Sequence, residues 1–120
     1  MIADRLLTGL GCLFGAAGIG LMALAAHGKW PSIDYAAIMV LAHATALIAI
    51  VVAIRAGLLH AMLARPAAFL LAAAVALFSA DVVLNAMTGQ RLFPMAAPIG
   101  GTGSMAAWLL VGVSALVAKK

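Results

Sequence analysis

Charged residues are scarce in this chain. Asp, Glu, Lys and Arg together make up 8% of its 120 residues, whereas hydrophobic residues make up 68%. A soluble domain of this size cannot cover its surface with so few polar side chains. We therefore expect lipid rather than water to be the main solvent of the chain, with the lipid bilayer as its first partner.

The sequence also lacks the motifs that carry most protein chemistry. Its single cysteine, Cys12, excludes an internal disulfide and any site built from several thiolates. It contains no Gly-x-Ser-x-Gly turn and no phosphate-binding loop. His27 and His43 fall at different depths of their segments, which argues against a metal site or a bis-histidine haem. We therefore expect no catalytic residue, no metal and no cofactor.

The cations of the chain do not form a patch. Seven Lys and Arg residues against three acidic residues give a net charge of +4, but the cations are scattered between apolar segments. A nucleic-acid-binding surface needs clustered cations, so no nucleic-acid partner is expected. Cations at the ends of apolar segments instead set the orientation of a membrane protein and contact anionic headgroups.

Long apolar segments are what the sequence has in abundance. Each of four segments approaches the roughly 20 residues that a helix needs to cross a ~30 Å hydrocarbon layer. Lipid offers backbone groups no hydrogen-bond partners, and the segments lack the alternation of barrel strands, so each should be a helix. The predicted fold is all-α: one transmembrane domain, residues 1–120, forming an integral membrane four-helix bundle. The predicted helices are 6–26, 36–54, 67–87 and 99–117.

Short connections separate these segments, so neighbouring helices should run antiparallel. In the second connection, residues 55–65 place leucines and a methionine at helical spacing. This stretch fits either a short amphipathic turn along the membrane surface or an extension of the second helix. The first segment is longer than the core of a signal peptide, so we expect it to be retained as a helix.

The orientation follows from the distribution of cations, because short loops rich in Lys and Arg stay in the cytoplasm. The amino-terminal flank, the second connection and the carboxyl-terminal tail form one side of the predicted bundle. This side holds Arg5, Arg55, Arg65, Lys119 and Lys120, and the other side holds Lys29 and Arg91. Both termini are therefore predicted to be cytoplasmic.

An acid within the third segment is the most informative residue. Because an acid in an apolar helix is costly, Asp81 should face the bundle interior and find polar partners. His43 lies at a similar predicted depth, and His27 and Asn85 lie nearer the same outer boundary. We therefore predict a buried polar cluster of His27, His43, Asp81 and Asn85. Such a cluster either fixes helix packing through hydrogen bonds or serves ligand, ion or proton chemistry.

Small residues mark expected close contacts between helices. Gly11 and Gly15 stand four residues apart in the first segment, a spacing that lets another helix approach within the bundle or from a second chain. Pro98, Gly100 and Gly101 precede the fourth predicted helix. Pro restricts φ and Gly permits a tight turn, so these three residues should form the structural turn that enters that helix.

Several separated motifs occur in a characteristic order. They are Ala26-His27-Gly28, His43-Ala44 followed by Ala46-Leu47, Phe78-Ser79, and Pro98-Ile99-Gly100-Gly101 before Trp108. In this order they resemble the small membrane proteins of the domain of unknown function 423 family, which is similar to animal transmembrane protein 256. The resemblance implies a four-helix protein of the bacterial inner membrane and brings no known activity. The residues around Asp81 depart from the family's Gly-Ser-Leu-Tyr run, so that acid is expected to be particular to this chain.

The predicted function is that of a non-enzymatic accessory or interaction subunit, in a larger membrane complex or a homo-oligomer. Four helices with small side chains offer packing surface but little room for a ligand. The alternative is a small carrier of a cation, proton or solute that uses the polar cluster in the outer half of the bundle. An enzyme acting on a lipid or quinone would need a pocket that opens between helices.

Overall fold

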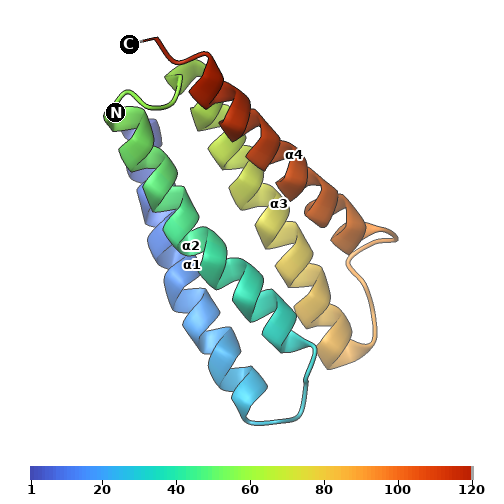
Figure 1. Cartoon of the computed structure of the whole chain (residues 1–120). Coiled ribbons are helices and arrows are strands. Elements are labelled where there is room, and N and C mark those ends of the chain that lie inside the picture. Colours follow the sequence, from blue (N-terminus) through green and yellow to red (C-terminus); the bar gives the residue numbers. More distant parts are fainter. Residues whose placement is uncertain (120) are drawn as a thin grey trace.

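The computed structural model describes residues 1–119 and contains four α-helices joined by short loops (Figure 1). The helices are α1 (Ile2–Ala26), α2 (Ile33–Arg55), α3 (Ala61–Thr88) and α4 (Ala96–Leu116). Each is long and apolar enough to cross a membrane, and no strand occurs in residues 1–119. The predicted all-α four-helix bundle is therefore confirmed, and the chain is a small integral membrane protein.

The helices form two antiparallel hairpins. α1 packs against α2, α3 packs against α4, and the two hairpins join along α2 and α3, with a lighter contact between α1 and α3. Both termini lie at one end of the bundle together with the α2–α3 loop, and the other two loops lie at the opposite end (Figure 1). We call these the terminal end and the loop end. The bundle is elongated, with extents of 51 × 27 × 20 Å.

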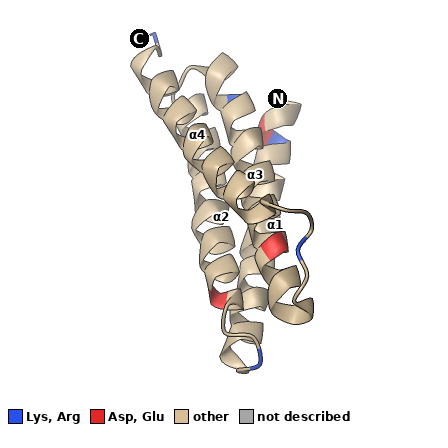
Figure 2. Ribbon diagram, turned by 90° about the vertical axis from the view of Figure 1, so that its right-hand side faces the viewer, with Lys and Arg blue, Asp and Glu red and all other residues tan. Residues whose placement is uncertain are grey.

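The core lies where α1, α2 and α3 meet. Leu7, Leu47 and Leu71 come from these three helices and are fully buried. The outer faces expose large apolar side chains such as Leu13 on α1 and Leu109 on α4, which suits contact with acyl chains. Charged residues gather at the terminal end and in the half of the bundle nearer the loop end, and an uncharged band separates the two sets (Figure 2). This distribution is the one that a membrane-spanning bundle requires.

All four helices begin earlier than the sequence predicted. α1 begins at residue 2 rather than 6, α2 at 33 rather than 36, α3 at 61 rather than 67, and α4 at 96 rather than 99. Two of these extensions take an acidic residue into the first helical turn, Asp4 in α1 and Asp34 in α2. The positive end of the helix dipole favours acids in the first turn. The acidic residue beside each apolar segment therefore lies inside the helix and does not mark where the helix begins.

The prediction that residues 55–65 extend the second helix was wrong. α2 ends at Arg55, residues 56–60 form a loop with turns, and the remaining residues belong to α3, which begins at Ala61. Pro66 lies inside α3 as its sixth residue, whereas the prediction placed it before the helix. A proline so close to the start removes one hydrogen bond, to the carbonyl of the exposed residue Met62, and the rest of the helix can continue.

The predicted turn at Pro98, Gly100 and Gly101 is also shifted, because all three lie inside α4. Pro98 is the third residue of the helix, a position whose N–H has no partner within a helix. The turn is made instead by Met95, whose φ of 71° is in the left-handed region. The proline therefore starts the helix, and the glycines serve another purpose.

Gly100 lets α4 lie directly on the backbone of α3. A Cβ atom added to Gly100 would stand 2.7 Å from both the Ala74 carbonyl oxygen and the Phe78 amide nitrogen. The neighbouring Gly101 differs, since a Cβ there would meet only the Phe78 Cδ2 atom at 4.0 Å, an ordinary contact. Gly11 plays the corresponding part between α1 and α2, where a Cβ would stand 2.9 Å from a backbone carbonyl. One glycine in each hairpin thus sets the helix spacing.

Candidate functional site

Charged and ring-bearing polar side chains form three separate groups, at the loop end, in the middle and at the terminal end. The single cluster predicted from the sequence is replaced by these groups. Asp81 and His43 are both buried but bond to different partners. Asn85 is half-buried, and His27 is exposed at the end of α1. Of the four predicted residues, only Asp81 and His43 therefore enter a hydrogen-bonded group.

The loop-end group is built around Asp81, which is fully buried. Its Oδ2 atom accepts a hydrogen bond from Arg91 Nη1 at 2.5 Å, and its Oδ1 atom accepts one from the Leu92 amide at 2.9 Å. Both donors belong to the α3–α4 loop, which folds back over the end of α3. The partners thus differ from the predicted His43 and Asn85, and the carboxylate fastens the loop to the helix.

The middle group joins α2 to α4 through His43 and Trp108. Trp108 Nε1 donates a hydrogen bond to His43 Nε2 at 3.0 Å, and His43 Nδ1 lies 2.6 Å from the Met39 carbonyl oxygen. An indole N–H can only donate, so Nε2 must be the acceptor and Nδ1 must carry the proton. The imidazole is therefore neutral, with both nitrogens engaged and neither left for a metal or ligand.

Trp108→Phe should lower the thermal stability of the protein, because it removes the donor to His43 Nε2 while keeping an aromatic ring. A buried acceptor left without a partner costs about 1–3 kcal/mol. The matched control is Trp30→Phe in the α1–α2 loop, where we expect little change. Thermal unfolding of both variants in detergent measures the difference, and equal stabilities would contradict the role of the hydrogen bond.

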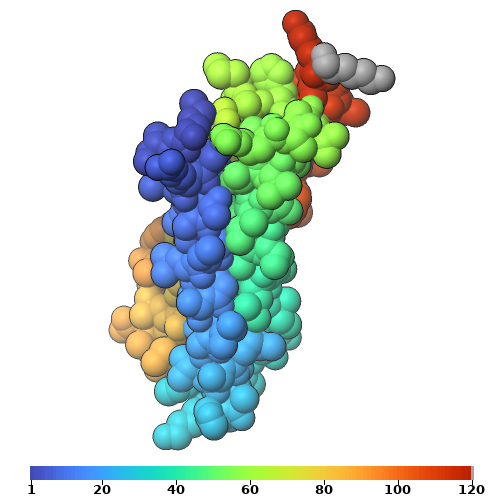
Figure 3. Space-filling model, turned by 90° about the vertical axis from the view of Figure 1, so that its left-hand side faces the viewer, coloured from blue at the N-terminus to red at the C-terminus, as the bar shows by residue number. Residues whose placement is uncertain are grey.

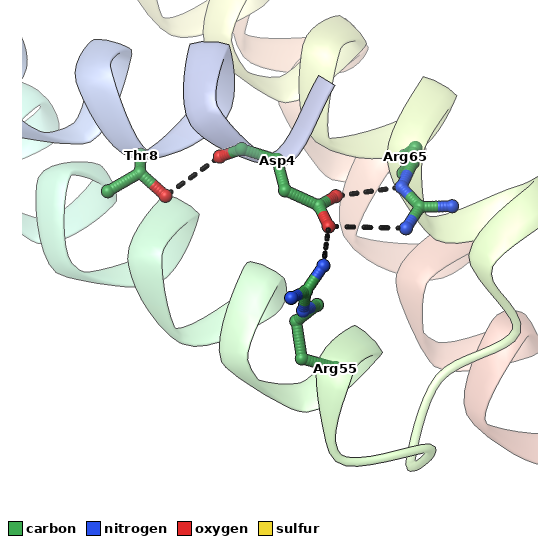
Figure 4. A network of polar contacts seen from close by, with 4 residues as sticks. All are labelled: Asp4, Thr8, Arg55 and Arg65. Carbon is green, nitrogen blue, oxygen red and sulfur yellow. Dashed lines mark hydrogen bonds and ion pairs between the residues drawn. The ribbon is translucent and has the colours of Figure 1, made fainter. Parts of the chain in front are cut away.

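The terminal-end group connects three helices through one carboxylate (Figure 4). Asp4 on α1 is buried, and it accepts hydrogen bonds from Arg65 Nε at 2.8 Å and Arg65 Nη2 at 3.3 Å. Arg55 Nη1 on α2 donates to the same carboxylate at 3.3 Å. The Thr8 hydroxyl donates to the Asp4 backbone carbonyl at 2.8 Å. Because Arg65 belongs to α3, this group holds α1, α2 and α3 together at the terminal end.

Sequence reasoning missed Asp4 because the residue flanks the first predicted helix instead of interrupting it. A usable signal was present, however. Asp4 is the one acidic residue on the side that holds Arg5, Arg55 and Arg65. A lone acid among several arginines at one membrane surface is expected to pair with one or more of them.

The two arginines of this group should contribute unequally to folding. The Arg65 side chain is 21% exposed and makes two hydrogen bonds to Asp4, whereas the Arg55 side chain is 64% exposed and makes one. Exposed ion pairs contribute little to stability. Arg65→Gln should therefore lower the melting temperature clearly more than Arg55→Gln, measured in the same detergent. Equal losses would show that the bidentate geometry is unimportant.

Besides these polar groups, the bundle carries an apolar groove. This groove, about 780 Å³, lies between α1, α2 and α3 and is lined almost wholly by apolar side chains such as Leu13, Phe14 and Leu84. Within residues 1–119, no three His, Cys, Asp or Glu side chains approach closely enough to hold a metal ion. The polar groups hold helices and loops against one another.

Comparison with known proteins gives one match. A family model described as a protein of unknown function, DUF423, matches residues 14–101. This region includes every motif of the predicted resemblance except Trp108, and the resemblance is thereby confirmed. No curated protein and no solved structure matches the chain.

Proposed function

The chain belongs to the DUF423 family of proteins of unknown function, and we propose that it acts as a non-enzymatic accessory or interaction subunit of a larger membrane complex. The observation that carries this proposal is the use of the buried polar groups. Asp4 and Asp81 each pair with arginine inside the chain, and His43 has both ring nitrogens engaged. These groups hold the bundle together, so the outer apolar faces are left for partners.

α4 offers one such face. It packs mainly against α3, and its other sides carry exposed side chains such as Leu109 and Leu116, which are 73% and 86% exposed. A Cβ atom added to Gly112 would meet no atom within 4 Å. An exposed glycine between large apolar side chains permits the close approach of another membrane helix.

Purification from native membranes in a mild detergent tests the proposal. We expect one partner protein in stoichiometric amount. Gly112→Phe should lose this partner without lowering the stability of the chain itself, because the new side chain points into open space. Gly20→Phe on α1 is the matched control, since its Cβ also meets no atom within 4 Å. A lone monodisperse species without a partner would refute the proposal.

We further propose that the protein lies in the bacterial inner membrane with both termini in the cytoplasm. Both termini share the terminal end (Figure 1). The arginines and lysines of that end are Arg5, Arg55, Arg65 and Lys119, whereas Lys29 and Arg91 lie in the loops at the loop end; Lys120 lies outside the described residues. The positive-inside rule then favours a cytoplasmic terminal end.

A reporter that is active only outside the cytoplasm should be inactive when fused after Lys120. The same reporter inserted in the α1–α2 loop at Gly28 should be active, because that loop lies at the opposite end. Reporter activity in whole cells is measured for both fusions. Strong activity of the carboxyl-terminal fusion would refute the proposed orientation.

A further inference from the structure

A second groove lies between α1 and α2 at the terminal end. It encloses about 530 Å³, and Arg5 and Arg55 lie on its rim beside the buried Asp4. Its lining continues toward the middle of the bundle through Gly9, Cys12 and Val51. Figure 3 shows the face on which α1 and α2 lie side by side. The groove therefore has a basic mouth, and Gly9, Cys12 and Val51 form a largely apolar floor.

The charges at the mouth do not balance. Asp4 receives two hydrogen bonds from Arg65, which does not line the groove. Arg55 contributes one hydrogen bond of 3.3 Å and remains 64% exposed, so most of its five N–H donors are available. Arg5 is exposed and makes no ion pair within residues 1–119. Arg5, Arg55 and Arg65 thus stand against the single carboxylate of Asp4, which leaves an excess of two positive charges at this end of the groove.

We propose that this groove is a binding site for an anionic phospholipid. The lipid phosphate lies between Arg5 and Arg55, since a guanidinium matches two phosphate oxygens. One acyl chain follows the floor from Gly9 to Cys12. Cys12 is seven residues beyond Arg5, or about 10 Å along the helix at 1.5 Å per residue, so the floor runs from the headgroup level into the hydrocarbon.

The unbalanced charge also sets the preference among lipids. A headgroup with a single net negative charge gains from both arginines, whereas a zwitterionic headgroup brings its own cation to the same place. The site is independent of the proposed subunit function, because its residues lie on α1 and α2 rather than on the exposed face of α4. A variant can therefore lose lipid binding and keep the partner protein, or lose the partner protein and keep lipid binding.

Native mass spectrometry of the full chain in a non-ionic detergent tests the site. The probes are phosphatidylglycerol, phosphatidylcholine and inorganic phosphate. Phosphatidylglycerol should bind more tightly than phosphatidylcholine, and removal of each arginine should weaken it about fivefold, or about 25-fold for Arg5→Gln with Arg55→Gln. Lys29→Gln, which removes a cation from the loop end, should change nothing. If the double variant fails to fold, the binding of phosphatidylglycerol to Arg5→Gln alone tests the site.

Two variants test whether an acyl chain lies on the apolar floor of the groove. Gly9→Leu fills the groove without meeting any atom within 4 Å at its Cβ, and it should weaken phosphatidylglycerol several-fold. Gly20→Leu makes the same change at a second open position of α1 and should leave binding intact. Unchanged binding in the arginine variants would overturn the site. Two results would overturn the placement of the acyl chain in the groove. One is unchanged phosphatidylglycerol binding in Gly9→Leu, and the other is displacement of the lipid by an equal concentration of inorganic phosphate.

Discussion

Gly100→Ala should destabilise the bundle strongly, whereas Gly101→Ala should not. The added Cβ at Gly100 would stand 2.7 Å from two backbone atoms of α3, the Ala74 carbonyl oxygen and the Phe78 amide nitrogen. Backbone atoms of a helix cannot rotate away as a flexible side chain can, so α4 has to move off α3. Overpacking of this kind costs about 1–3 kcal/mol, and Gly100→Val should cost still more.

The neighbouring glycine provides the matched control. At Gly101 the same methyl group meets only the Phe78 ring at 4.0 Å, and replacing a helical glycine with alanine favours the helix by up to about 1 kcal/mol. Gly101→Ala should therefore keep or raise the melting temperature, measured by circular dichroism in detergent. Equal effects of the two substitutions would show that the contact with the α3 backbone does not set the helix spacing.

The contrast between these glycines shows where sequence reasoning reaches its limit. The Pro98-Ile99-Gly100-Gly101 run correctly indicated a structural role for small residues near the start of the last helix. Helical periodicity alone, however, does not reveal which face of α4 meets α3. Since Gly100 and Gly101 differ by about 100° around the helix, one of them lies in the contact and the other beside it.

The helices themselves were predictable because lipid leaves the backbone few choices. An apolar segment of about 20 residues must satisfy its own hydrogen bonds, so each became a helix in the predicted order. The helix ends were harder to predict. Asp34 and Pro66 suggested boundaries, yet acids and prolines are both tolerated in the first turns of a helix.

The polar partners were harder still, because they depend on how loops fold. Depth along the helix axis placed His43 and Asp81 at one level, but depth does not fix rotation about that axis. His43 turns toward Trp108 on α4, and Asp81 turns toward a loop that returns over it. The nine residues between Asp81 and Arg91 carry no signal for this return; the only signal is that an acid and a cation lie near each other in the sequence.

Asp81→Leu should sharply reduce the yield of folded protein. The substitution removes both acceptors of the α3–α4 loop, so the Leu92 amide loses its partner and Arg91 loses its counter-charge. The exposed acid Asp34, in α2 near the loop end, provides the matched control, since Asp34→Leu leaves no buried donor behind. Folded yield and thermal unfolding in detergent measure both variants. A normal Asp81→Leu protein would show that the carboxylate does not hold the loop.

Asp81→Asn distinguishes a structural role of Asp81 from a role in transport. Leu92 and Arg91 bond different oxygens of the carboxylate, and the amide replaces one of these oxygens with an NH₂ group that cannot accept. The stability of Asp81→Asn should therefore fall between those of wild type and Asp81→Leu. Arg91→Gln should then cost less in the Asp81→Asn background than in wild type, because the pair is already broken. Additive losses would contradict the ion pair. In proteoliposomes we expect no proton or cation flux above that of empty vesicles. A wild-type flux that disappears in a folded Asp81→Asn protein would favour a carrier instead, since only the titratable carboxylate would have been lost.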